Sequence, residues 1–216
     1  QFPPPPTLVE TVGNPEEGNW LDLPPGLAFP LPTGQRWFAE AHYVNTSANA
    51  VCVNTAFYID LIDDSEVEAY VGTVNFDAGG FSIPPQSDHE EVFDCSWPLE
   101  DVYLLSLGGH MHEFGAAITI AQAEDAEGAE TVLYSVDEWE PEFRYLPPLL
   151  NFEPGEVPIA SGDILRTTCS WANDTAGELS YPDEMCTVFG VAYPLPESIH
   201  CDAGNWFDQS GRLSGR

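Results

Sequence analysis

Apolar and polar residues alternate with a period of two in seven stretches of the chain, and this period places side chains on opposite faces of a β-strand. The stretches are residues 37–44, 53–62, 92–95, 102–107, 116–123, 164–170 and 186–191. No long stretch repeats apolar residues at the 3.6-residue spacing of an amphipathic helix. The pattern predicts short strands and little helix.

Turn-forming residues separate these stretches. Pro, Gly and Asp gather at residues 32–34, 77–80, 84–85 and 154–155, where they favour tight turns and interrupt strands. Short strands punctuated in this way are typical of an antiparallel β-sandwich or jelly roll, whose two inner faces supply the core. We therefore expect an all-β fold of this class.

The length of the chain fits one such domain. Its 216 residues, 43% of them apolar, are enough for one well-packed core. Residues 1–24 are rich in Pro, Gly and Glu and form the expected lead-in segment. We expect the β-sandwich domain at residues 25–205 and a disordered tail at residues 206–216.

The charge of the chain excludes nucleic acid as a partner. There are 36 acidic residues and five basic ones, which gives a formal net charge of -31. This charge repels phosphate backbones and anionic lipid, and its self-repulsion is reduced where salt screens it. No run approaches the roughly 18 apolar residues of a membrane span. The charge therefore indicates a protein of saline surroundings, and the sequence predicts no membrane span.

Cysteine usage indicates the compartment. Five cysteines in an acidic chain without lysine indicate an oxidising environment, with two disulfides and one cysteine left over. We expect a secreted, periplasmic or extracellular protein.

Two histidines two residues apart are the first candidate for chemistry. His110 and His112 lie at i and i+2 at the end of a predicted strand, so both side chains project from one face and can share one metal ion. Gly108 and Gly109 just before them allow a bulge or a close approach of the backbone. The alternative is two surface or packing histidines at a strand end.

Met185 is the candidate third ligand. It stands at the start of another predicted strand, next to Cys186. A thioether joined to two imidazoles suits Cu(I) far better than it suits hard cations, and three protein ligands leave a position open. The alternative is an ordinary core methionine.

Three motifs together resemble a known family. They are Leu-Ser before the pair His110-x-His112 with Gly after it, then Gly162-Asp163-Ile164-Leu165 followed by Cys169, and Glu184-Met185-Cys186. The pattern resembles the C-terminal catalytic domain of the ascorbate-dependent type II copper monooxygenases, which include peptidylglycine and dopamine monooxygenases. It spans roughly residues 25–201.

The resemblance implies an antiparallel jelly roll and a catalytic site. One copper ion would be bound by His110, His112 and Met185, where O₂ and a small-molecule substrate meet. The reaction would be hydroxylation of a C–H bond with an ascorbate-type reductant.

A second resemblance concerns electron delivery. Ala41-His42-Tyr43 is similar to the family's His-Tyr segment, so His42 would be a remnant of the second, electron-transfer copper site. The other two histidines of that site belong to the family's N-terminal domain. This implies that a missing N-terminal domain or a partner completes the second site.

The resemblance also assigns the cysteines. It implies the disulfides Cys169–Cys186 and Cys95–Cys201, and it gives Cys52 a partner in the N-terminal domain. The alternative for Cys52 is a buried free thiol.

Two departures from the family limit the functional prediction. In the peptide-amidating members an arginine and a tyrosine hold the substrate carboxylate, and Gly108 and Phe189 stand at those positions here. The substrate is therefore not identified. Three functions stay open: a copper monooxygenase domain, a secreted copper-binding or copper-handling protein without oxygenase activity, and an interaction module with incidental histidines.

Overall fold

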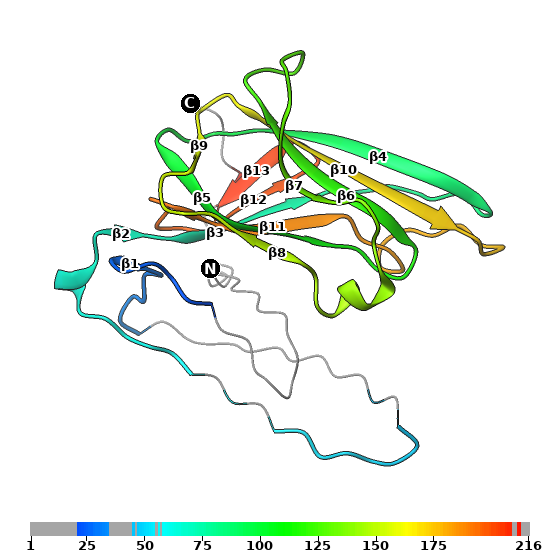
Figure 1. The fold of residues 1–216 in the computed structure, drawn as a ribbon, viewed down its shortest axis with the longest axis horizontal. Coiled ribbons are helices and arrows are strands. Elements are labelled where there is room, and N and C mark those ends of the chain that lie inside the picture. The colour runs from blue at the N-terminus through cyan, green and yellow to red at the C-terminus, as the bar shows by residue number, and fades with distance from the viewer. Residues whose placement is uncertain are drawn as a thin grey trace.

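The structure, a computed structural model, describes residues 21–34, 45, 47–54, 56, 58–208 and 211–212. Two β-sheets packed face to face form most of it (Figure 1). The smaller sheet has four strands. In spatial order they are β4 (Ser87–Ser96), β10 (Ile164–Asn173), β6 (Gly115–Ala123) and β7 (Thr131–Val136). All neighbours in this sheet are antiparallel.

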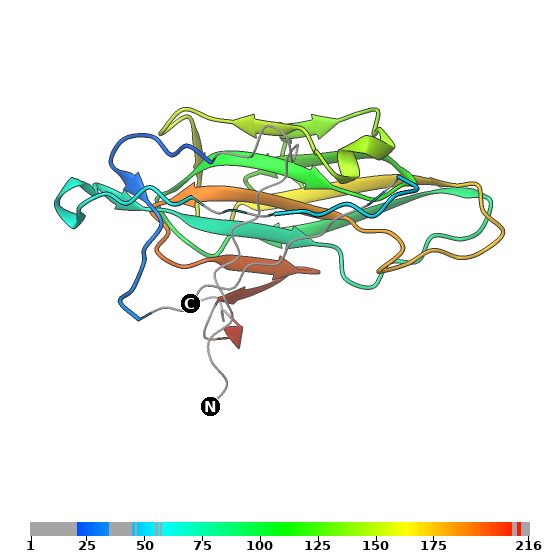
Figure 2. The same cartoon turned by 90° about the horizontal axis from the view of Figure 1, so that it is seen from below.

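The larger sheet has eight strands, and most of them lie side by side in the view from below (Figure 2). In spatial order they are β14 (Gly211–Arg212), β13 (Asn205–Asp208), β12 (Ile199–Asp202), β3 (Gly72–Asp77), β11 (Thr187–Tyr193), β5 (Val102–His110) and β8 (Leu149–Asn151). A further strand, β9 (Val157–Ile159), also pairs with β5. Of these pairs, only β12 with β3 is parallel.

The remaining described elements are short. β1 (Leu27–Ala28) and β2 (Ala69–Tyr70) form a parallel pair. The helical content of the described chain is two 3-10 turns, η1 (Asp64–Glu66) and η2 (Pro141–Arg144). The prediction of an all-β sandwich with little helix is confirmed. Across the described residues, no helix has the length and apolar composition needed to cross a bilayer.

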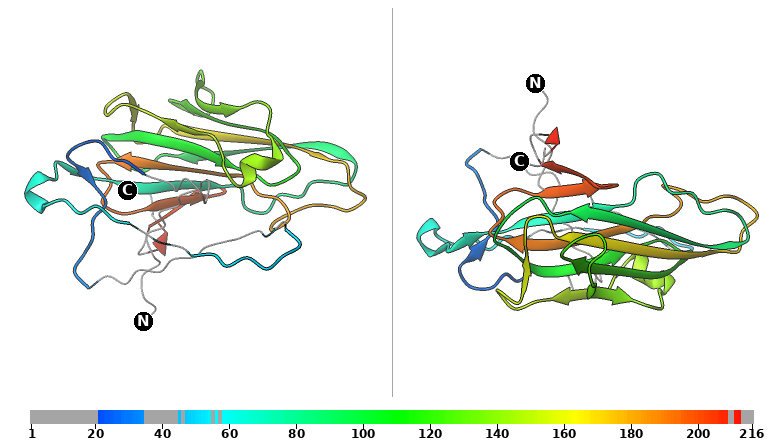
Figure 3. Two further views of the ribbon diagram at one scale, coloured as in Figure 1. Left: turned by 60° about the horizontal axis from the view of Figure 1, so that its bottom comes forward. Right: turned by 90° about the horizontal axis from the view of Figure 1, so that it is seen from above.

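The core lies between the two sheets, which Figure 3 shows as layers. Alternation along β10 shows the principle, because Leu165, Thr167, Cys169 and Trp171 are buried while their neighbours are more exposed. Leu104 and Leu107 of β5, together with Val188 of β11, meet them from the larger sheet.

Both expected disulfides are present, and each joins one sheet to the other. Cys95 of β4 bonds to Cys201 of β12, and Cys169 of β10 bonds to Cys186, just before β11. Cys52 is free and exposed, so the alternative of a buried thiol is wrong.

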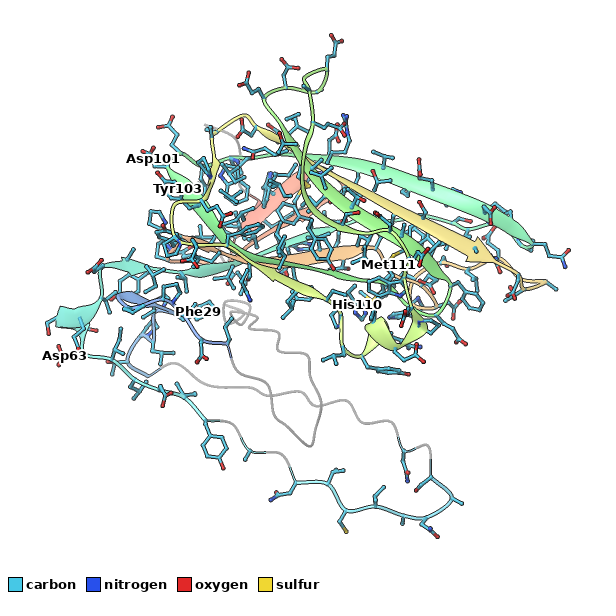
Figure 4. All side chains as sticks on the ribbon, in the orientation of Figure 1. Phe29, Asp63, Asp101, Tyr103, His110 and Met111 are labelled. Atoms are coloured by element: carbon cyan, nitrogen blue, oxygen red, sulfur yellow. A yellow bond between two sulfur atoms is a disulfide. The ribbon has the colours of Figure 1, made fainter. Side chains whose placement is uncertain are left out.

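The larger sheet also has an outer face, turned away from the smaller sheet. Near the start of β5 this face carries a second apolar cluster, formed by Val71, Leu105 and Val191. Leu23, Leu27 and Phe29 pack against this cluster. One end of the outer face is therefore covered by residues 21–29, and Figure 4 shows Phe29 there, with His110 near the other end of the sheet.

The structure corrects two predictions about segments. In the predicted strand 53–62, the described residues form no strand, and Val53, Tyr58 and Leu61 are among its exposed side chains. An alternating pattern becomes a strand only where a neighbour pairs with the backbone. The predicted strand 37–44 lies outside the described residues.

The second correction concerns the tail predicted at residues 206–216. Its first residues belong to β13, and Trp206 is buried against Phe76 and Trp97. The indole Nε1 of Trp206 donates to the carbonyl oxygen of Ser96 over 2.6 Å. Burial of this one aromatic ring extends the packed domain to Asp208.

Candidate metal centre

Two adjacent glycines at the end of β5 face opposite sides of the larger sheet. A Cβ added to Gly109 would lie 2.9 Å from Ile118 of the smaller sheet, so Gly109 faces the core. A Cβ added to Gly108 would lie 2.5 Å from Leu149 and 2.8 Å from Phe189, both at the outer face. These glycines permit close packing on both sides. His110, two residues after Gly108, therefore points to the outer face.

The two histidine rings lie close together. The centroids of the His110 and His112 rings are 5.2 Å apart and the ring planes are nearly perpendicular, at 89°. Two imidazoles bound to one metal through nitrogens at about 2 Å, with a tetrahedral angle between them, have centroids about 5 Å apart. The spacing of the rings fits a shared metal ion.

The strand that follows Met185 lies directly beside the histidine strand. The β5–β11 ladder pairs Gly108 with Phe189 and His110 with Thr187. The same register, continued by two residues, sets His112 opposite Met185. Met185 is half-buried, whereas the other methionine, Met111, is fully buried in the core between the sheets.

One buried carboxylate holds the two segments together. Glu184 is fully buried, and its Oε2 accepts from the main-chain N–H groups of His112 at 3.0 Å and Met185 at 3.4 Å. The indole N–H of Trp171 donates to the same oxygen over 3.1 Å, and the main-chain N–H of Phe114 donates to Oε1 over 2.7 Å. Four donors satisfy the buried charge, and they fix the backbone on both sides of the candidate site.

The orientation of the His112 ring is fixed by a main-chain carbonyl. Its Nδ1 lies 3.0 Å from the carbonyl oxygen of Asp183. A carbonyl oxygen only accepts hydrogen bonds, so Nδ1 carries the proton and Nε2 keeps a free lone pair. On the other side, the indole of Trp139 donates to the carbonyl oxygen of His112 over 3.1 Å. Nε2 is therefore the ring atom of His112 that could bind a metal ion.

The environment of His110 keeps its ring neutral. Burial, followed by the neighbouring charges of His112 and Arg144, lowers the pKa of His110 to about 4, against an opposing attraction from Asp77. A neutral imidazole is the form that binds a metal. His110 can therefore act as a ligand throughout the neutral and mildly acidic range.

A histidine–carboxylate pair, His200 with Asp77, lies on the same sheet. Nε2 of His200 lies 2.7 Å from a carboxylate oxygen of Asp77, and this contact raises the pKa of His200. The two strands that carry them, β12 and β3, are adjacent, and β11 separates β3 from β5. The charge of Asp77 acts on both histidines, because it also opposes the lowering of the His110 pKa.

The structure brings together some of the expected site residues. His110 and His112 share one locality, and the backbone of Met185 lies beside that of His112. His42 lies outside the described residues. Within the described ranges, no group of three or more His, Cys, Asp or Glu side chains is arranged to hold a metal. A site of two histidines and one methionine would not form such a group, because methionine is not one of these four residue types.

Sequence reasoning did not single out the residues that support the site. Glu184 and Asp183 stand in the quoted motif with Met185, but nothing in their sequence neighbourhood says that Glu184 is buried. Trp139 and Arg144 stand in no motif. The contacts that Glu184, Asp183 and Trp139 make with His112 join residues at least 27 positions apart.

Comparisons with known proteins do not identify a family. No protein-family model matches the chain, and no curated protein matches it. Among solved structures, a chain of Desmodium yellow mottle tymovirus matches 82% of this chain and 99% of its own length, with 9% identity and a TM-score of 0.26. At this TM-score the similarity carries no argument about fold or function.

Proposed function

We propose that this protein binds one copper ion through His110, His112 and Met185, and that it acts as the O₂-activating domain of a copper-dependent monooxygenase. The observation that carries the proposal is the shared carboxylate. Because His112 and Met185 both donate main-chain N–H groups to Oε2 of Glu184, their backbones lie side by side. A shared hydrogen-bond acceptor fixes the positions of two candidate ligands relative to each other.

The donor set suits copper better than a hard cation. His110 is held neutral by its surroundings, and His112 presents Nε2 because its Nδ1 is bonded to Asp183. The thioether of Met185 is a soft donor that favours Cu(I), and three protein ligands leave a coordination position open. The half-exposed position of Met185 leaves that side of the site accessible.

Bound copper would supply one-electron redox chemistry and a place for O₂ beside the substrate. Hydroxylation of a C–H bond consumes O₂, two electrons and two protons, and it yields an alcohol and water. An external reductant of the ascorbate type supplies the electrons in this proposal. The protein would position the two imidazoles, and apolar atoms of Leu149 and Phe189 lie over Gly108, two residues before His110.

Copper binding without oxygenase activity is the second candidate. The reaction above needs a second electron at the moment of turnover, and His42 is the only residue of this chain that the resemblance assigns to the second copper site. One ligand does not hold a copper ion tightly. This favours a copper-binding or copper-handling protein if no partner delivers that electron.

Secretion is part of the proposal. Two disulfides join the sheets, and stable disulfides form in oxidising compartments. A formal charge of -31 further suits a protein dissolved in salt-rich surroundings. The proposed location is therefore extracellular or periplasmic.

The two methionines provide a matched test of copper binding. Anaerobic competition with a chromophoric Cu(I) chelator should show one tightly bound Cu(I) per chain. Met185→Leu keeps the size of the side chain but removes the thioether, so it should weaken Cu(I) binding at least tenfold and weaken Cu(II) binding much less. Met111→Leu, in the core, should leave both affinities unchanged. Equal affinities in the two variants would contradict the proposal.

The histidines and oxygen consumption separate the two candidates. His110→Ala or His112→Ala should abolish tight binding of either ion, whereas His89→Gln in β4 should not. Ascorbate-dependent O₂ consumption by the copper-loaded protein, lost in His110→Ala, would support the monooxygenase. Tight copper binding without any such consumption would favour the copper-binding protein.

A further inference from the structure

Two asparagines of the chain stand in the three-residue motif that accepts N-linked sugars, which is Asn-x-Ser or Asn-x-Thr with any residue but Pro at x. They are Asn45, with Ser47 at the third position, and Asn173, with Thr175 there. The motif is short and also occurs by chance, so the sequence alone does not say which asparagine can be modified. In the structure the two lie in different surroundings.

Both motifs form the same local turn. Oδ1 of Asn45 accepts the main-chain N–H of Ser47 over 3.0 Å, and the hydroxyl oxygen of Ser47 lies 2.8 Å from it. Oδ1 of Asn173 accepts the main-chain N–H of Thr175 over 3.0 Å and the hydroxyl over 2.7 Å. In this Asx turn the third residue of the motif faces the asparagine side chain. The local geometry therefore does not distinguish the two motifs.

Burial distinguishes Asn173. It is 2% exposed and lies at the end of β10, where it pairs with Ser87 of β4. Its Nδ2 donates to the carbonyl oxygens of Pro84 and Gly177, both over 2.9 Å, and lies 3.3 Å from that of Ile83. An amide NH₂ group has two donors, so both are used inside the fold. A sugar on this nitrogen would break these bonds and displace the surrounding chain.

Asn45 lies on an exposed segment. Its Nδ2 donates to the carbonyl oxygen of Asn49 over 2.9 Å, and among the described residues this is its one acceptor. Every described residue in the range 45–66 is exposed, and none of them lies in a strand. In Figure 1 the cyan coil of this segment runs clear of both sheets. An enzyme can therefore reach Nδ2 of Asn45 in the folded chain.

We propose that Asn45 carries an N-linked glycan in the exported protein and that Asn173 stays unmodified. The donor is an oligosaccharide linked through phosphate to a membrane lipid. Nδ2 of Asn45 forms a bond to the anomeric carbon of the first sugar, the bond from that carbon to the phosphate oxygen breaks, and the amide loses one proton as the lipid phosphate leaves. This inference rests on the proposed secretion of the protein and not on the copper site.

Tandem mass spectrometry of intact glycopeptides tests the site in protein purified from the organism that encodes it. The peptide that contains Asn45 should carry an oligosaccharide, and the peptide that contains Asn173 should have its unmodified mass. Exported protein with an unmodified Asn45, or with a glycan on Asn173, would overturn this inference alone. Protein that stays inside the cell would overturn the proposed location and this inference with it.

Variants produced in the same organism identify the acceptor and test the hydroxyl. Asn45→Gln should abolish the glycan, and so should Ser47→Ala, which keeps the asparagine but removes the hydroxyl. Ser47→Thr keeps the hydroxyl and should keep the glycan. Asn49→Gln is the matched control, because it makes the same change on the same exposed segment outside the motif. A glycan that persists in Asn45→Gln or Ser47→Ala, or that is lost in Asn49→Gln, would contradict the proposal.

Transfer in vitro tests whether burial decides between the two motifs. A purified oligosaccharyltransferase with a lipid-linked oligosaccharide is given the folded chain and, separately, a reduced and alkylated chain that circular dichroism shows to be unfolded. In the folded chain Asn45 should be modified roughly tenfold faster than Asn173 or more, because Asn173 must first give up buried hydrogen bonds. In the unfolded chain the two rates should approach each other. Equal rates in the folded chain, or an undiminished difference in the unfolded one, would overturn the inference.

Discussion

The main-chain N–H of His112 and that of Met185 donate to the same carboxylate oxygen, Oε2 of Glu184, over 3.0 and 3.4 Å. These two residues are 73 positions apart in the chain, and they belong to segments at the ends of neighbouring strands. The candidate metal centre therefore depends on a buried residue that contributes no ligand.

Glu184→Gln should lower both the stability of the protein and its affinity for copper. An amide has one accepting oxygen and a donating NH₂ group, so it cannot accept all four hydrogen bonds that the carboxylate accepts. Leaving buried donors unsatisfied costs roughly 1–3 kcal/mol of unfolding free energy. Denaturant unfolding measures the stability, and chelator competition measures Cu(I) affinity.

Glu113→Gln serves as the control for this prediction. Glu113 is exposed and follows His112 directly, so the variant makes the same change of charge close to the site. It should leave stability and copper affinity nearly unchanged. If it matched Glu184→Gln in both measurements, the effect would come from net charge and not from the buried hydrogen bonds.

The two disulfides should separate stability from copper binding. Cys95–Cys201 closes a sequence separation of 106 residues and Cys169–Cys186 one of 17. In the chain-entropy model these loops are worth about 5 and about 3 kcal/mol. Replacing both cysteines of Cys95–Cys201 by Ala should therefore cost more unfolding free energy. Replacing those of Cys169–Cys186 should lower copper affinity more, because Cys186 is next to Met185.

The affinity comparison decides this prediction. It is made on protein that is shown to be folded by circular dichroism, at a temperature below both melting transitions. A larger loss of copper affinity on removal of Cys95–Cys201 would contradict the role given to the start of β11.

The stability of the metal-free protein should depend on the protonation of His110. Its pKa in the folded state is about 4, below the ordinary value of 6.5, so between these values the unfolded chain binds a proton that the folded chain does not. The contribution of neutral His110 to the free energy of unfolding is complete above about pH 6.5 and is lost as the pH falls toward 4. Nuclear magnetic resonance titration should find His110 neutral at pH 5.5, and His110→Gln should remove this part of the pH dependence.

His200 should act in the opposite direction. Its hydrogen bond to Asp77 raises its pKa above the ordinary value. Stability from this pair is complete below the unfolded pKa and is lost as the pH rises through the folded pKa. Asp77→Asn should lower the pKa of His200 in a nuclear magnetic resonance titration. An unchanged pKa in that variant would show that Asp77 is not its cause.

Strand periodicity predicted much of this fold because each correct strand buries one face. The stretch 102–107 lies within β5, and the stretch 116–123 lies within β6, where alternate side chains reach the core. The stretch 53–62 has the same alternation but pairs with nothing among the described residues. Periodicity specifies which face is apolar, but it does not specify whether a partner strand is present.

Several strands that sequence reasoning missed are short, and β3 begins at a residue that usually breaks strands. β3 starts at Gly72, where a Cβ would lie 2.6 Å from the carbonyl oxygen of Glu197, so a close approach of two backbones requires glycine. β12 and β13 have four residues each, too few to show a period. Tertiary packing around Trp206 decides that these residues join the sheet.

The candidate site was partly predictable for a similar reason. The i, i+2 spacing is enough to place His110 and His112 on one face, and their rings do lie together. The contributions of Glu184 and Arg144 depend on burial and on contacts across the fold, which a single sequence does not encode locally.

X-ray absorption at the copper edge of Cu(I)-loaded protein tests the central claim most directly. Two histidines and one methionine predict two nitrogen neighbours and one sulfur neighbour around the ion in the wild type and in Met111→Leu. The sulfur neighbour should disappear in Met185→Leu, while the nitrogen neighbours remain. A wild-type spectrum without sulfur, or a sulfur signal that persists in Met185→Leu, would contradict the assignment of His110, His112 and Met185 as the copper ligands.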